Sequence, residues 1–274
     1  MDSNRTCEIY TGHAKSIKLK TLNKVAKSLC TIKIDNIKAT GFFIKFERDE
    51  INLFTLVSSH HLLPNIFGKK SIEILIDISN KKENIRLNIK GRKMKYFEPQ
   101  NIAVIEIIDK DFLEKKVEFL SCDFKCNSEI YKNYLNTDIF IMYHPNGEEL
   151  ECCSGKIIKV NEPKEFNFEH SLDIKNGSSG SPILLFEKSS EEPEVIGIQT
   201  SSVCENKNNV GTFINLFKEK LLGEENYNEY LEILYTTPGS KVLLDSETSL
   251  YVKKLEVVQN SDIEVKGSLI IGPH

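Results

Sequence analysis

Short runs in which apolar and polar residues alternate set the strongest limit on the fold of this chain. A period of two places the apolar side chains on one face of a β-strand, whereas a helix needs a period near 3.6. Six such runs occur before residue 110, separated by polar or turn-forming residues, and the first three predict an antiparallel meander. The runs are residues 29–34, 40–46, 53–57, 71–78, 85–89 and 101–107.

Six further runs follow a charged, cysteine-bearing stretch at residues 109–135. Two successive sets of similar length favour a pair of barrels over one sandwich. We therefore predict an all-β fold of two six-stranded antiparallel β-barrels, one at residues 28–115 and one at 116–222. The runs of the second set are residues 139–143, 152–160, 165–168, 183–186, 195–200 and 211–214.

Both ends of the chain carry other patterns. Apolar residues near helical spacing predict a short amphipathic helix at residues 14–28, within an N-terminal lead-in at 1–27. Residues 216–234 also have a helical pattern, interrupted near Gly223. The end of the chain alternates again, so residues 223–274 are expected to form a helix and β extension. The sequence shows no internal repeat.

The composition indicates a soluble globular protein with enough apolar residues for a large core. The 274 residues are 40% hydrophobic and 28% charged, and the net charge is −4. This charge predicts no nucleic-acid partner. No run of 18 apolar residues occurs, so we expect no membrane span.

The cysteines and the first residues predict where the protein is found. Seven cysteines, an odd number, lack the spacing of a zinc site, so free thiols in a reducing compartment are expected. The polar start of the chain lacks the apolar segment of a signal peptide. We therefore predict an intracellular protein, cytoplasmic or nuclear, with no metal.

A small-residue segment at residues 176–182, Asn-Gly-Ser-Ser-Gly-Ser-Pro, carries the clearest chemical signal. Gly177 allows a positive φ and a close approach of the backbone to a substrate. The N–H groups of Gly177 and Ser179 can then converge on one point, as an oxyanion hole requires, with Ser179 as the nucleophile. The alternative is a plain Ser/Gly linker.

A serine nucleophile needs a base within hydrogen-bond reach, and six histidines are candidates. His60 and His61 end an apolar strand and precede a turn, where a base can be exposed and still rigidly held. The other four fit different settings: His13 and His274 lie near the ends, His144 lies in a turn, and His170 is expected at the surface.

Four motifs, in order along the chain, resemble the landmarks of trypsin-like (chymotrypsin-fold, PA clan) serine peptidases. They are Thr-Gly-Phe-Phe-Ile at 40–44, Leu-Val-Ser-Ser-His-His-Leu-Leu-Pro at 56–64, Asn-Ile-Ala-Val-Ile-Glu-Ile at 101–107 and Gly-Ser-Ser-Gly-Ser-Pro at 177–182. The sequence is most similar to the intracellular, disulfide-free branch with HtrA-type and related eukaryotic peptidases. The resemblance covers about residues 28–222.

The resemblance implies catalytic roles and one departure. It implies His61 as the general base, or His60 in an alternative register, with Ser179 as the nucleophile. It places Asn101 where the family has an aspartate that orients the imidazole. Three readings stay open: Asn101 orients His61 in a slow enzyme, Glu98 supplies the carboxylate, or the chain only binds. Asn101 is otherwise a polar residue that begins a strand.

The resemblance also implies a substrate pocket. Asp173 lies at the offset of the residue that selects Lys or Arg in trypsin, although a loop aspartate is also common at surfaces. Gln199 and Gly211 would form opposite walls of the cleft. Ser178 stands where secreted members carry an activating aspartate, so no zymogen cleavage is expected.

Two classes of function follow, each with a peptide or protein partner and no cofactor. The first is a serine endopeptidase acting by acyl transfer. The second is a pseudopeptidase that binds peptides or partner proteins in the same cleft. A further hypothesis gives residues 223–274 a role in oligomerisation, since no other feature of the sequence fixes an oligomeric state.

Overall fold

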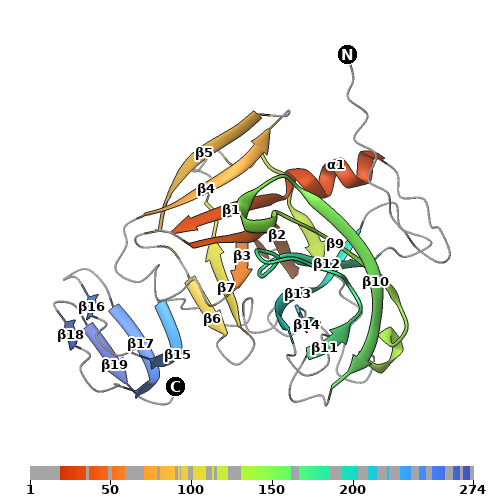
Figure 1. The fold of residues 1–274 in the computed structure, drawn as a ribbon. Coiled ribbons are helices and arrows are strands. Elements are labelled where there is room, and N and C mark those ends of the chain that lie inside the picture. The colour runs from red at the N-terminus through yellow and green to blue at the C-terminus, as the bar shows by residue number, and fades with distance from the viewer. Residues whose placement is uncertain are drawn as a thin grey trace.

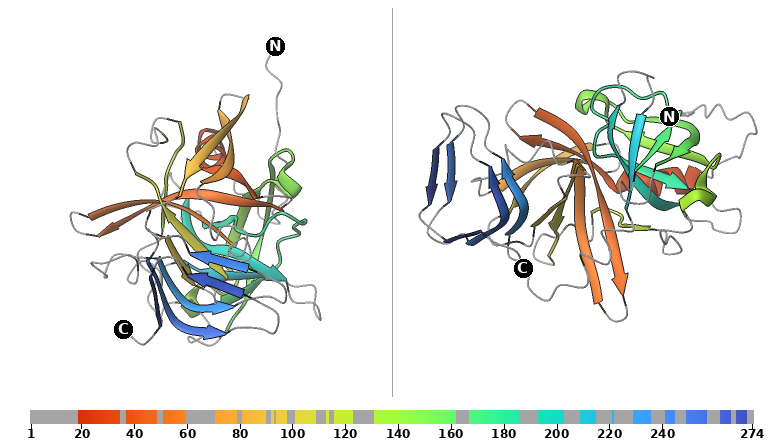
Figure 2. Two further views of the ribbon diagram at one scale, coloured as in Figure 1. Left: turned by 90° about the vertical axis from the view of Figure 1, so that its left-hand side faces the viewer. Right: turned by 90° about the horizontal axis from the view of Figure 1, so that it is seen from below.

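The fold is given by a computed structural model of the chain. It describes residues 19–34, 37–48, 51–59, 71–78, 81–89, 92, 94–97, 101–108, 113, 116–122, 131–161, 167–185, 193–202, 209–214, 221, 229–235, 241–244, 249–256, 262–265 and 268–271. Figures 1 and 2 show a mostly β architecture with one short helix near the N-terminus.

Helix α1 (Leu19–Lys27) lies within the helix predicted at residues 14–28, whose first five residues are outside the described ones. Val25 is fully buried, and Leu22 and Ala26 pack with it against the core between the two halves of the protein. Ser28 follows the helix and donates its hydroxyl hydrogen to the Val25 carbonyl at 2.6 Å. No helix in the described ranges is long and apolar enough to cross a membrane.

The N-terminal half is a seven-stranded antiparallel sheet, in the order β5-β4-β1-β2-β3-β7-β6. The meander β1-β2-β3 is confirmed. The sheet packs around a core that includes Phe43, Leu56 and Ile74. Among the described pairings none joins β5 to β6, so closure of the predicted first six-stranded barrel is not confirmed. The strands are β1 (Leu29–Ile34), β2 (Ile37–Arg48), β3 (Ile51–Ser59), β4 (Ser71–Ile78), β5 (Lys81–Asn88), β6 (Met94–Phe97) and β7 (Ile102–Glu106).

The C-terminal half contains a closed six-stranded antiparallel barrel, which confirms one of the two predicted barrels. The pairings run β9-β10-β11-β14-β13-β12 and return to β9. Phe168, Phe213 and Ile183 are among the side chains that fill it. The strands are β9 (Asp138–Tyr143), β10 (Glu151–Val160), β11 (Asn167–His170), β12 (Pro182–Leu185), β13 (Glu194–Ser202) and β14 (Asn209–Phe213).

A short strand, β8 (Leu120–Cys122), joins the two halves. It pairs in parallel with β2 on one side and with β13 on the other. A second core lies between the halves and includes Phe42, Val57 and Phe140. Because buried apolar contact and a backbone ladder both cross this junction, the two halves are held in a fixed relation.

The C-terminal segment is built from parallel strands. β15 (Glu229–Tyr235), β17 (Ser249–Glu256) and β19 (Ser268–Ile271) form one stack, and β16 (Lys241–Leu244) pairs with β18 (Asp262–Val265) in a second sheet. Glu229 pairs with Leu250 and Ser249 pairs with Ser268, so the chain returns to the next strand of the stack after about 20 residues. Figure 1 shows this unit beside β6, with which β15 pairs in parallel.

The helix predicted at residues 216–234 is wrong over its last part, because residues 229–235 form strand β15. This segment contains Tyr, Ile and Leu, which suit a strand as well as a helix. Its neighbours β6 and β17 both offer it a backbone ladder, and that tertiary pairing decides the outcome. The regular spacing of the paired strands β15, β17 and β19 can be seen in their pairing, but no pattern of residue types reveals it.

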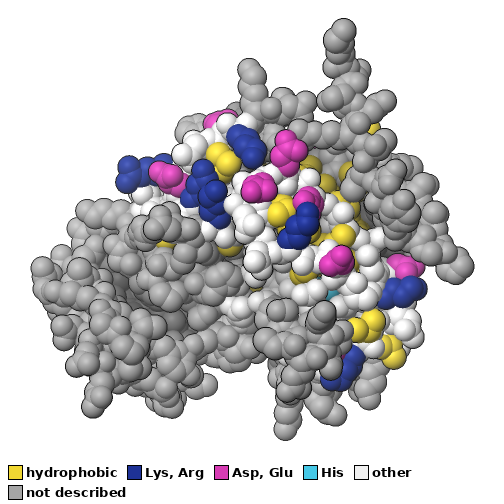
Figure 3. Space-filling model, in the orientation of Figure 1, with side chains coloured by type: hydrophobic (Ala, Val, Ile, Leu, Met, Phe, Trp, Pro, Cys, Tyr) yellow, Lys and Arg dark blue, Asp and Glu magenta, His cyan; other side chains and the backbone are white. Residues whose placement is uncertain are grey.

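Charges of both signs are mixed on the described surface in the view of Figure 3. The exposed ion pairs of the described residues include Lys116 with Glu83 and Lys175 with Glu151. Exposed pairs of this kind contribute little to stability. On this face the described residues form no broad patch of a single sign.

Candidate active site

Ser179 lies in a tight turn that precedes β12. Gly177 has φ +92° and Gly180 has φ +87°, which are left-handed values that favour glycine. A Cβ on Gly180 would stand 2.3 Å from the Thr40 carbonyl oxygen and 2.6 Å from Ser58 Oγ. Ser178 is buried, whereas Ser179 is partly exposed. The glycines therefore allow this turn to lie directly against β2 and β3, with Ser179 partly exposed.

Strand β13 holds the residues that follow the serine. The Gly180 amide donates to the Gln199 carbonyl at 2.8 Å, and the Gln199 amide donates to the Ser181 carbonyl at 2.9 Å. Within the turn, the Ser181 amide donates to the Ser178 carbonyl at 3.0 Å. The backbone around Ser179 is thus fixed by hydrogen bonds on its C-terminal side.

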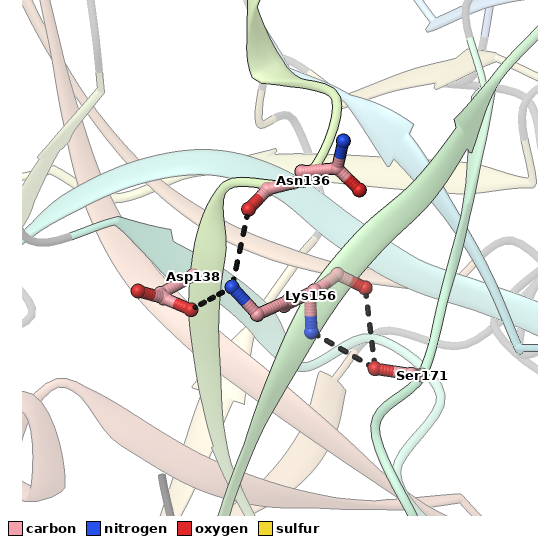
Figure 4. Close-up of polar contacts among 4 residues, drawn as sticks. All are labelled: Asn136, Asp138, Lys156 and Ser171. Atoms are coloured by element: carbon pink, nitrogen blue, oxygen red, sulfur yellow. Dashed lines mark hydrogen bonds and ion pairs between the residues drawn. The ribbon is translucent and has the colours of Figure 1, made fainter. Parts of the chain in front are cut away.

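Strand β10 holds the start of the loop that leads to this turn (Figure 4). Figure 4 shows that the Lys156 amide donates to Ser171 Oγ at 2.9 Å and that this hydroxyl donates to the Lys156 carbonyl at 3.4 Å. The Ser171 amide also donates to the Lys156 carbonyl, at 3.0 Å. The Lys156 ammonium group in turn lies 2.9 Å from an Asp138 carboxylate oxygen and donates to the Asn136 carbonyl at 3.4 Å. The loop from residue 171 to the serine therefore begins at a fixed point.

Asn101 lies at the junction of the two halves, in the turn before β7. Its φ of 56° is left-handed, a conformation that Asn tolerates better than most residues. Its Oδ1 accepts a hydrogen bond from Ser59 Oγ at 3.1 Å, and its Nδ2 donates to the Thr200 carbonyl at 2.9 Å. Asn101 thereby connects the end of β3 to the residue after Gln199 in β13.

The predicted base is not described by the structure. His60, His61 and Glu98 all lie outside the described residues. His60 directly follows Ser59, the last residue of β3, and Ser59 bonds Asn101. The chain therefore leaves β3 toward the predicted histidines at the point where Asn101 is held.

His170 is not at the surface, contrary to the prediction. It is fully buried at the end of β11, and its Nε2 lies 2.7 Å from Gln199 Oε1. Burial lowers the pKa of His170 to about 4, although the bond to Gln199 opposes this shift, so the ring is neutral near pH 7. The predicted strand ended at residue 168, whereas β11 continues to His170. Because side chains two residues apart lie on the same face of a strand, His170 shares the face of Phe168.

The three residues predicted for the pocket occupy different environments. Gln199 is buried and binds His170, as described above. Gly211 pairs with Gln199, and a Cβ there would lie 2.5 Å from Phe168 Cζ, so packing requires glycine. Asp173 is exposed in the loop before the turn. The pKa of Lys175 is raised mainly by its hydrogen bond to Glu151, and the nearby charge of Asp173 adds to this shift.

No family model matches the sequence, and no curated protein matches it either. Solved structures do match. A serine endoprotease from Yersinia pestis has a TM-score of 0.54 at 12% identity, over 81% of this chain and 73% of that one. Rv3671c from M. tuberculosis H37Rv, a serine-to-alanine mutant in an inactive form, has a TM-score of 0.51 at 12% identity, over 81% of this chain and 100% of that one.

A viral enzyme gives a similar result. Catalytically active tobacco etch virus protease in complex with product has a TM-score of 0.50 at 15% identity, over 79% of this chain and 86% of that one. At such identities the likeness shows the fold alone. The chain therefore has a protease-like fold, that of the chymotrypsin-type serine proteases.

Proposed function

We propose that this protein is a serine endopeptidase that cleaves peptide bonds by acyl transfer, within a catalytic unit at residues 28–222. The turn that presents Ser179 is the observation that carries this proposal. Its two glycines have left-handed φ values, and β13 holds the residues after the serine by two backbone hydrogen bonds. A plain linker would need neither feature.

The proposed reaction follows from the roles of three residues. Ser179 Oγ attacks the carbonyl carbon of the peptide bond while His61 removes the hydroxyl proton. The Gly177 and Ser179 amides donate to the oxygen that becomes negative. His61 then gives the proton to the leaving amine, which forms the acyl-enzyme. Water, activated by His61, releases the acid and regenerates the serine.

The orientation of the Asn101 amide supports a positioning role toward His61. A carbonyl oxygen only accepts, so the nitrogen of the amide is the atom that faces Thr200. Oδ1 therefore faces Ser59, at the end of the strand from which His61 follows. In this orientation Oδ1 can accept a hydrogen bond from an imidazole Nδ1–H, which is the tautomer that a serine base requires.

Asn101 supplies no negative charge to stabilise an imidazolium, so we propose a slow enzyme. In the trypsin-like proteases, an Asp to Asn change at the acid position lowers kcat by about 10⁴. That factor corresponds to about 5 kcal/mol of lost transition-state stabilisation. Glu98 remains the alternative carboxylate, three residues earlier in the sequence.

For the substrate pocket we propose walls at Gln199 and Gly211. Asp173 would favour a Lys or Arg side chain in the residue before the cleaved bond. An Asp173→Asn variant tests this assignment: a lower kcat/KM for Lys and Arg substrates supports it, whereas equal loss for all substrates contradicts it.

Covalent labelling tests the proposed activity directly. A fluorophosphonate probe phosphonylates an activated serine and loses fluoride, so the wild-type chain should be labelled and Ser179→Ala should not. Ser181→Ala is a matched control two residues further along the same turn, and it should remain labelled. Folded wild-type protein that resists the probe would refute the endopeptidase assignment.

The uncharged Asn101 also favours a second candidate, a pseudopeptidase that binds peptides or partner proteins in the same cleft. This function predicts peptide binding without turnover and equal affinity in the wild type and in Ser179→Ala. Calorimetric titration of both forms with the same peptide library distinguishes it from the endopeptidase.

A further inference from the structure

Two carbonyl groups of the serine turn are held by atoms from outside it. The Asn146 amide donates to the Asn176 carbonyl at 3.1 Å. Thr40 Oγ1 donates to the Gly177 carbonyl at 2.8 Å. Asn146 belongs to the connection between β9 and β10, whereas Thr40 belongs to β2 in the other half of the protein.

The first bond fixes the direction of the proposed oxyanion donor, and the second fixes the peptide that follows it. In a planar trans peptide the C=O and the N–H point in opposite directions. Because the Asn176 carbonyl points at Asn146, the Gly177 N–H points away from Asn146. Because the Gly177 carbonyl points at Thr40, the Ser178 N–H points away from Thr40, and it donates to the Lys175 carbonyl at 3.3 Å. A rotation of either peptide would break one of these bonds.

The connection that holds Asn176 is itself a rigid turn, Pro145–Gly147. Asn146 has φ 48° and Gly147 has φ 74°, so two successive residues are left-handed. Asn146 is exposed, so burial of its side chain does not explain this conformation. The turn is closed by the Gly147 amide, which donates to the His144 carbonyl at 3.1 Å, and by the Glu148 amide, which donates to the Pro145 carbonyl at 2.7 Å. An outlier conformation of this kind is typical of functional sites.

Thr40 connects this turn to the serine turn through one hydroxyl group. Thr40 is fully buried, and its Oγ1 accepts from the His144 amide at 3.2 Å while it donates to Gly177. Ser58 Oγ donates to the Thr40 carbonyl at 2.8 Å, which fixes the residue from its other side. A Cβ on Gly177 would lie 2.3 Å from the Asn146 amide nitrogen, so the two turns are in direct contact.

We propose that Thr40 and the turn Pro145–Gly147 are positioning groups that hold the Gly177 peptide in its oxyanion-binding orientation. This inference rests on the proposed endopeptidase function. It explains how the hole is formed although Ser178 stands where secreted members of the family carry the aspartate of the activating ion pair. Neither group touches the substrate. The turn holds the peptide that carries the Gly177 N–H, and Thr40 holds the next peptide, so Gly177 is fixed from both sides.

The test compares Thr40→Val with Thr40→Ser. Valine keeps the shape of the side chain and removes the hydroxyl, whereas serine keeps the hydroxyl. One oxyanion donor is worth about 10²–10³ in kcat. We expect Thr40→Val to lower kcat by about 10² with little change in KM, and Thr40→Ser to restore most of it.

A peptide aldehyde gives a second measurement that a purely structural role would not change. Ser179 Oγ adds to the aldehyde carbon, the hydroxyl proton passes to the new oxygen, and that oxygen occupies the hole. Aldehyde affinity should fall in Thr40→Val in parallel with kcat, while a substrate peptide binds Ser179→Ala and the Thr40→Val, Ser179→Ala double variant equally. Equal aldehyde affinity in folded wild type and Thr40→Val would overturn the proposal.

Asn146 provides variants at an exposed position, which are independent of any loss of stability at buried Thr40. Asn146→Gly accepts the left-handed φ, whereas Asn146→Val strongly disfavours it. We expect Val to lower kcat and Gly to maintain it; equal rates in both variants would refute the role of the turn. If the wild type neither labels nor turns over, the proposed function fails, whereas an active wild type with an equally active Thr40→Val refutes only this inference.

Discussion

Replacing Asn101 by aspartate should raise the rate and lower the stability at the same time. The new carboxylate would occupy the site where Oδ1 now accepts from Ser59 at 3.1 Å. There it can stabilise the imidazolium of His61, so kcat/KM should rise by between about 10² and 10⁴, the upper value being the full effect of an acid at this position. This range corresponds to about 3–5 kcal/mol of transition-state stabilisation.

The loss of stability in this variant arises at the position of the Asn101 Nδ2 atom. Nδ2 of Asn101 donates to the Thr200 carbonyl at 2.9 Å, and an aspartate would place a second acceptor there. An unsatisfied partner of a partly buried hydrogen bond costs about 1–3 kcal/mol of unfolding free energy. Left-handed φ is tolerated by Asp as it is by Asn, so the backbone at 56° adds little.

The assay pairs kcat/KM on a cleaved peptide with the free energy of unfolding in urea. Asn101→Gly is the matched control, because glycine accepts the same φ and removes both side-chain bonds without adding charge. It should lose stability and gain no rate. An aspartate variant that folds but is no faster than wild type, or a glycine variant that is equally fast, would refute the assignment of Asn101 to the acid position.

Three further predictions concern pH, the serine turn and the C-terminal strands. The pKa of His170 is about 4, below the value near 6.5 in the unfolded chain, so the unfolded chain binds the proton more tightly. The free energy of unfolding should therefore fall as the pH falls through this window, by up to about 3 kcal/mol. His170→Gln should flatten the pH dependence of the free energy of unfolding in urea, and an unchanged slope would contradict this prediction. Gly180→Ala should abolish fluorophosphonate labelling because its Cβ would meet the Thr40 carbonyl at 2.3 Å, whereas Gly147→Ala, which meets the flexible end of Lys38 at 2.7 Å, should retain part of it. A chain ending at residue 222 lacks β15, which pairs with β6, and should unfold at a lower temperature by calorimetry; an equal unfolding midpoint would show that the β6–β15 ladder contributes nothing to stability. Sedimentation of the same chain tests the hypothesis that residues 223–274 mediate oligomerisation.

Alternation of apolar residues predicted most strands because each one buries a single face. The run at 71–78, for example, coincides with β4. Besides β15, two strands were missed: β8 has three residues, too few to show a period, and β6 begins Met94-Lys95, with Lys95 buried against the usual preference. A lysine in a buried position breaks the pattern that the prediction depends on.

The sequence predicted the turn around Ser179 but not the groups that hold it. Glycines with small neighbours are a local signal, so residues 177–182 could be recognised from the chain alone. The partners Thr40 and Gln199 lie far from the serine in sequence, and neither residue type is distinctive. Burial of His170 depends equally on a tertiary contact, because its partner Gln199 lies 29 residues away.

The bond from Thr40 to Gly177 joins residues 137 positions apart, and that from Asn101 to Thr200 joins residues 99 apart. Contacts of such long range form late, because a long loop must close first. The serine turn is synthesised before Gln199 and Thr200, so β13 cannot support it until those residues have been added and have left the ribosome. Until then the turn lacks the two hydrogen bonds that β13 supplies, so under the proposed function we expect the nascent chain to become an active peptidase only after β13 has paired with the turn.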